Sequence, residues 1–100
     1  LAYAAMLRTG LEGIRQKLTP PPPVEENVYD FGDEQLCEKS IESLPGSLVE
    51  ALGELERDEV LRETLGEHLY EAFMRAKMTE WDQYSIQVTP WEIEQYLPLL

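Results

Sequence analysis

The residue types that most often carry catalysis or bind metal ions are scarce in this sequence. It contains one histidine, His68, and one cysteine, Cys37. A zinc-binding helix needs a pattern such as His-Glu-x-x-His, whereas His68 is followed by Leu-Tyr-Glu. We expect His68 to be solvated on the polar face of a helix, because catalytic histidines normally converge with other groups in a cleft.

Cys37 is expected to have a structural role. A single cysteine can form neither an internal disulfide nor a cysteine-based metal site. Its neighbours Asp33, Glu34 and Glu38 are acidic, and negative charge disfavours the thiolate that a reactive cysteine requires. We therefore predict a half-buried, unreactive thiol.

The many carboxylates do not form a recognisable site either. Adjacent pairs such as Glu25-Glu26 and Asp58-Glu59 occur where solvated side chains are expected. The spacing of a calcium-binding loop is absent, and so is the glycine-rich pattern of a phosphate-binding loop. The residues thus predict no catalytic residue, no cofactor-binding residue and no metal ligand, and they favour an assembly or interaction element.

Composition excludes two further classes of function. The 100 residues include 20 acidic and 8 basic side chains, which gives a net charge of -12. This charge repels the phosphates of nucleic acids and the anionic surface of membranes. There is no apolar run of the roughly 18 residues that would span a bilayer, and no secretory signal pattern. We expect a cytoplasmic protein that binds neither nucleic acid nor membranes.

The patterning predicts an all-α fold of about five or six helices with a Pro-rich extended loop. Residues 1–18 form the first helix, because apolar residues recur at spacings of three and four. It has no N-cap residue, so we expect residue 1 to lie inside a longer helix. Gly10 and Gly13 each cost about 1 kcal/mol relative to alanine, and close packing against a neighbouring backbone would offset this.

A Pro-rich loop, residues 19–32, and a group of short helices, residues 33–65, follow. Four successive prolines favour a rigid extended spacer, although short Pro-rich runs also bind SH3-type modules. The second half of the loop is predicted to be extended. Among the short helices, Ser47 and Glu50 make a capping box, and Asp58 caps the next helix.

Residues 66–87 are predicted to form one long amphipathic helix. Two charged residues, Lys77 and Glu80, intrude on its apolar side. They are three positions apart and can therefore pair on the helix surface.

Residues 89–100 are predicted to form a separate terminal helix and tail. Thr89 and Glu92 make a second capping box, with Pro90 at the favoured first helical position. Exposed apolar patches usually mark docking surfaces, so we expect the tail to contact another protein. The apolar residues that form this predicted interface are Trp91, Ile93, Tyr96, Leu97, Leu99 and Leu100.

Four blocks, together covering most of the chain, resemble the C-terminal segment of type I glutamine synthetase. They are LAYAAMLRTGLEGI (1–14), VEENVYD (24–30), SLPGSLVEALGELERDEVLRETLGEHL (43–69) and EWDQYSIQVTPWEIEQYL (80–97). The resemblance implies the C-terminal helical part, residues 1–100, of a larger α/β catalytic domain. It implies a parent ligase that joins ammonia to glutamate through γ-glutamyl phosphate, using ATP and magnesium or manganese. The family's metal, phosphate and ammonia residues lie upstream of Leu1, so none is carried onto this sequence.

The resemblance also implies two features of regulation and assembly. In one branch of the family a loop tyrosine receives AMP, and Tyr29 in Val-Tyr-Asp-Phe-Gly-Asp-Glu matches its position without the two prolines that follow. The segment after Gly66 is more similar to a branch controlled by feedback inhibition and nitrogen-regulatory proteins, so an ordinary loop tyrosine is the alternative. The family's C-terminal helix joins two stacked hexameric rings.

A second reading of the chain needs no parent enzyme. An independent acidic helical module could offer the same apolar tail to another protein, as a regulatory adaptor does. In either reading the tail is an interaction surface, and the 100 residues alone are expected to be inactive as a ligase.

Overall fold

The computed structural model describes all residues from Leu1 to Leu100, and it confirms the all-α fold. No strand is present. The elements in chain order are the helices and two short 3-10 turns, η1 and η2: α1 (Ala2–Arg15), η1 (Val28–Asp30), α2 (Asp33–Glu38), α3 (Leu48–Arg57), α4 (Glu59–Leu65), α5 (Glu67–Ser85), α6 (Pro90–Tyr96) and η2 (Leu97–Leu99).

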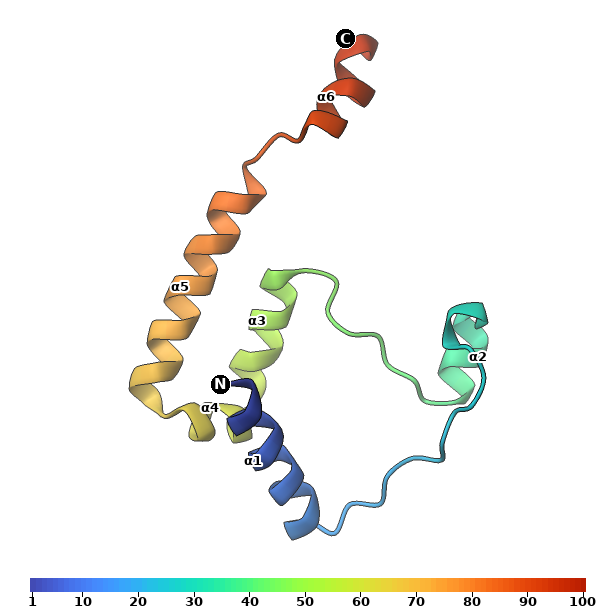
Figure 1. Cartoon of the computed structure of the whole chain (residues 1–100), viewed down its shortest axis with the longest axis vertical. Helices are drawn as coiled ribbons and strands as arrows, with labels where there is room; N and C mark the ends of the chain where they lie inside the picture. The colour runs from blue at the N-terminus through green and yellow to red at the C-terminus, as the bar shows by residue number, and fades with distance from the viewer.

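Four helices, α1, α3, α4 and α5, pack together, and the rest of the chain extends away from them (Figure 1). Helix α4 contacts α1, α3 and α5, so it is the centre of this group. The loop after α1 swings out to α2 and returns to α3, and α6 lies beyond the end of α5. No helix of the chain combines the length and the apolarity that crossing a membrane requires.

The packed helices bury very little. Leu52 in α3 is the single buried residue, at 3% exposure. The accessible surface is 9010 Å², whereas a compact monomer of 11.5 kDa exposes about 5,800 Å². The radius of gyration, 18.7 Å, likewise exceeds the value of about 13 Å for a compact chain of this length. Many apolar side chains of these helices, above all those of α1, are therefore left exposed within the 100 residues.

A sharp corner joins α4 to α5 at Gly66. Its φ is +72°, in the region that favours glycine, and it both ends α4 and precedes the first residue of α5. The corner lets two helices that are adjacent in sequence pack against each other.

Local capping explains where several helices begin. The Asp58 carboxylate accepts a hydrogen bond from the Leu61 amide at 3.0 Å, as predicted. Ser47 accepts one from the Glu50 amide at 3.3 Å. A capping box also requires the Glu50 carboxylate to accept from the Ser47 amide, and this part of the prediction was wrong. Glu50 accepts instead from the Gly46 amide at 2.9 Å. The carboxylate therefore reaches one residue further back than a capping box requires.

Two other expectations are corrected by the structure, and a third finds no partner within the chain. Cys37 is exposed and not half-buried, because α2 packs on no large apolar surface. The segment after the prolines is not fully extended, because Asn27 caps the turn η1 through the Tyr29 amide. Close packing was expected at Gly10 and Gly13, but no other segment of these 100 residues lies within 4 Å of a methyl group built on either, so a close neighbour would have to lie outside them.

Candidate functional site

The side chains with catalytic potential do not converge. His68 is exposed on α5, and Cys37 is exposed on α2, which lies well away from α5 (Figure 1). The chain contains no group of three or more histidine, cysteine, aspartate or glutamate residues placed to hold a metal ion. The candidate sites are therefore surfaces and loops, and the four described next differ in charge and in polarity.

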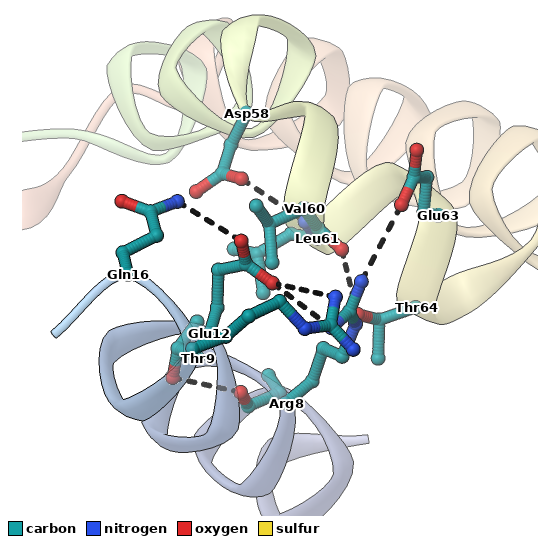
Figure 2. Close-up of polar contacts among 11 residues, drawn as sticks. Arg8, Thr9, Glu12, Gln16, Asp58, Val60, Leu61, Glu63 and Thr64 are labelled. Carbon is teal, nitrogen blue, oxygen red and sulfur yellow. Dashed lines mark hydrogen bonds and ion pairs between the residues drawn. The ribbon is translucent and has the colours of Figure 1, made fainter.

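A polar network fastens α1 to α4 (Figure 2). The Arg8 guanidinium contacts the Glu12 carboxylate at 3.1 Å and that of Glu63, on α4, at 3.5 Å. Glu12 also accepts hydrogen bonds from Gln16 at 2.9 Å and from Arg15 at 3.2 Å. The Gln16 bond, and then the charges of Arg15 and Arg8, lower the pKa of Glu12 from 4.5. Every charge in the network is compensated, which suits a structural clamp better than a reacting group.

An acidic pocket of about 370 Å³ opens at the corner between α4 and α5. Four glutamates line it, and they are joined by Arg62, whose guanidinium lies 5.0 Å from the centre of the Tyr70 ring. The four are Glu59, Glu63, Glu67 and Glu71. Such a surface repels the phosphate groups of a nucleotide. The residues present do not fit either ATP or a dedicated Mg²⁺ site.

The turn η1 presents Tyr29 to solvent. Its side chain is 94% exposed, so the ring is not packed. Lys39, which directly follows α2, contacts both sides of the turn: its ammonium lies 2.8 Å from the Glu26 carboxylate and 5.1 Å from the centre of the Phe31 ring. The hydrogen bond from Lys39 lowers the pKa of Glu26 below 4.5. The phenol is therefore displayed on a small, internally braced loop.

The terminal helix α6 is well formed but contacts little besides η2. The predicted capping box is confirmed: the Glu92 carboxylate accepts from the Thr89 amide at 2.7 Å, and the Thr89 hydroxyl accepts from the Glu92 amide at 3.2 Å. We call the apolar residues of α6 and η2, together with Leu100, the terminal apolar patch. Their exposed fractions are Trp91 61%, Ile93 47%, Tyr96 57%, Leu97 63%, Leu99 79% and Leu100 103%.

The patch has some internal order despite its exposure. The rings of Trp91 and Tyr96 lie edge to face, with their centres 6.0 Å apart. An arrangement of this kind contributes about 0.5–1.5 kcal/mol beyond burial. The patch is thus a preformed apolar surface on a rigidly capped helix.

Sequence reasoning found the ion pair on α5 and missed the other five. Lys77 and Glu80 pair as predicted. The Arg8–Glu63 pair joins residues 55 positions apart, and the Lys39–Glu26 pair joins residues 13 positions apart. Neither pair joins neighbours on one helix, which are three or four positions apart, so no pattern in the sequence could have indicated them. The pairing of Arg8 with Glu12, four positions along α1, carried such a signal.

Comparison with known proteins identifies the family of the chain. Residues 1–96 match the family described as the catalytic domain of glutamine synthetase. The chain belongs to this family. It is 50% identical over 99 residues to the glutamine synthetase of Thermotoga maritima, 48% over 97 residues to that of Methanocaldococcus jannaschii and 46% over 97 residues to that of Thermus thermophilus.

These relatives are much longer than the chain. The aligned segments cover 99%, 97% and 97% of the chain but only 23%, 21% and 22% of the respective relatives. The chain therefore corresponds to less than a quarter of a glutamine synthetase.

We predict that the Glu92 carboxyl titrates below 4.5, because the Thr89 amide and hydroxyl hydrogen bond to its charged form. A lowered folded-state pKa means that the stabilisation of α6 is present above the unfolded value of 4.5 and is lost as pH falls through the folded value. A carbon-13 titration of the Glu92 carboxyl measures this directly.

Replacing Thr89 by alanine should move the Glu92 midpoint upward, toward 4.5, because one of the two donors is removed. Thr79→Ala is the matched control, since Thr79 bonds only to the Arg75 carbonyl of α5. An unchanged midpoint in Thr89→Ala would show that the hydroxyl does not stabilise the carboxylate.

Proposed function

We propose that these residues are the C-terminal helical part of the catalytic domain of a glutamine synthetase. The protein that contains them would join ammonia to L-glutamate with hydrolysis of ATP, through γ-glutamyl phosphate. The observation that supports this most directly is the family match over residues 1–96, together with 40–50% identity to relatives along nearly the whole chain. It gives no support to an independent regulatory module.

The chain's part in this activity is structural. Its pocket at the α4–α5 corner carries the wrong charge for a nucleotide, and no group of side chains fits a metal ion. ATP and Mg²⁺ or Mn²⁺ would therefore be bound by the rest of the domain. The helices of this chain would support that site from outside, and alone they would be inactive.

The terminal apolar patch is proposed as a contact between subunits in a homo-oligomer of two stacked hexameric rings. Its exposure supports this, because burying a large apolar side chain contributes about 1.5–3 kcal/mol. The free energy gained by burying six such side chains exceeds the entropic cost of ordering α6, because its first turn is already held by the Thr89–Glu92 capping box. A nitrogen-regulatory protein is a further proposed partner.

Tyr29 is proposed as an adenylylation site. Its phenol is accessible, at 94% exposure, on a loop braced from behind by Lys39. A modifying enzyme could reach the hydroxyl without unfolding any helix. The missing prolines after Tyr29 leave the turn dependent on the Asn27 cap.

We predict that the full-length protein carrying these residues forms glutamine from glutamate and ammonium in an ATP-dependent manner. A variant lacking residues 1–100 should lose all measurable activity, because the apolar surface that these helices cover would be exposed. Glutamine formation and phosphate release are measured together. Absence of activity in the full-length protein would remove the proposal, and so would full activity in the truncated variant.

Deletion of residues 98–100 should weaken pairing of the rings. The deletion removes Leu99 and Leu100, two of the most exposed members of the terminal apolar patch. Native mass spectrometry should show single rings or smaller species in place of the double ring. Glu94→Gln, an exposed polar change on the same helix, is the control and should retain the wild-type mass.

Protein isolated from cells grown in nitrogen excess should carry AMP on Tyr29. The peptide containing Tyr29 is examined by tandem mass spectrometry, with protein from nitrogen-starved cells beside it. The Tyr29→Phe variant is the control, and it should carry no adduct and should keep its activity in nitrogen excess. Unmodified Tyr29 under both conditions would leave an ordinary loop tyrosine.

A further inference from the structure

One side of α1 forms an exposed apolar surface, which we call the outer face of α1. Two rows of residues spaced by four lie next to each other on this side of the helix. Every large side chain in these rows is at least half exposed. The rows are Met6 (69%), Gly10 and Ile14 (76%), and Tyr3 (88%), Leu7 (67%) and Leu11 (50%).

The opposite side of α1 is already occupied. Arg8 and Glu12 lie on it and face α4, where Arg8 reaches Glu63 (Figure 2). Because α1 packs on α4 with this side, the outer face points away from the other helices of the chain. It can be covered only by something outside the 100 residues.

The outer face is also free of charge in a chain that is otherwise strongly acidic. Of the 20 acidic residues, Glu12 alone lies in α1, and it belongs to the network with Arg8. An uncharged apolar helix face of this size is typical of a surface that is covered in the native protein.

Gly10 lies in the middle of the outer face, and nothing within the chain explains it. It has no left-handed φ, and a methyl group built on it would meet no atom within 4 Å. A glycine inside a helix is unfavourable relative to alanine. Its presence at the centre of an apolar face indicates that another backbone approaches α1 closely at this point.

The occupant that fits these observations belongs to the same polypeptide. The matched family is a single catalytic domain, and the chain spans only 21–23% of the relatives' length. Elements of one domain pack around one core. Helix α1 contacts α4 on one side and has an apolar surface on the other, which is the pattern of a helix that is covered on both sides. We propose that the outer face of α1 packs against the remainder of the catalytic domain of its own chain, with Gly10 at the closest approach.

This proposal rests on the proposed function, and it concerns a different surface from the terminal apolar patch. The patch lies on α6 and the residues after it, which Figure 1 shows well away from α1 and α4. The outer face of α1 would be an intrachain contact, whereas the patch would contact another subunit. Loss of the two contacts should therefore have different consequences for the monomer and for the oligomer.

The first test compares two glycine substitutions in the full-length protein. Helix propensity alone predicts that Gly10→Ala and Gly53→Ala both raise the melting temperature, since neither methyl group meets an atom within 4 Å in this chain. We expect Gly10→Ala to lower it by at least about 3 °C and Gly53→Ala not to lower it. An equal rise in both variants would overturn the proposal.

The second test identifies the occupant. A benzophenone amino acid is placed at position 14 of the full-length protein, and the oligomer is assembled from unlabelled and nitrogen-15-labelled subunits. Cross-links of uniform isotope content to a segment outside residues 1–100 are expected. Mixed-isotope cross-links would mean that a second copy covers α1, and cross-links within residues 1–100, or none, would mean that no such contact exists. Either result overturns the proposal.

The glutamine-forming assay on the wild-type protein separates this proposal from the one on which it rests. An inactive wild-type protein would refute the proposed function whatever the cross-links show. An active protein whose outer face of α1 is uncovered would refute only the contact.

Discussion

The chain cannot bury its own apolar side chains, and the rest of its structure follows from this constraint. Only Leu52 is buried, and the accessible surface exceeds that of a compact monomer of the same mass by about 3,200 Å². Hydrophobic burial is the main favourable term in folding, so a group of helices this open cannot depend on it alone. The apolar side chains left exposed are the basis for the proposed contacts with protein beyond these residues.

Local interactions specify the helices in place of a core. Side chains cap α3, α4 and α6 at Ser47, Asp58 and Thr89, and each supplies an acceptor for an otherwise free amide. Ion pairs three or four positions apart add to this along α1, α3 and α5. Isolated helices shorter than about 12–15 residues are marginal in water, so such local terms decide where each helix begins.

The same distinction separates what the sequence could predict from what it could not. The all-α fold, the Asp58 cap and the Thr89–Glu92 capping box depend on neighbouring residues, and all were predicted. The Arg8–Glu63 clamp and the exposure of Cys37 depend on how distant segments meet, and they were not. The unfavourable helix propensity of Gly10 predicted a close neighbour, and no such neighbour lies within these residues.

The distribution of charge connects the constraint to the proposed role. Four glutamates of α4 and α5 line the pocket at the corner between these helices and keep that side in water. The outer face of α1 and the terminal apolar patch are the apolar regions, and they lie on different helices that do not contact each other. A domain that must bind both its own core and a neighbouring subunit needs two such surfaces. The acidic region would disfavour a wrong contact in which either apolar surface takes the place of the other, because such a contact would bury charged groups without partners, which is costly.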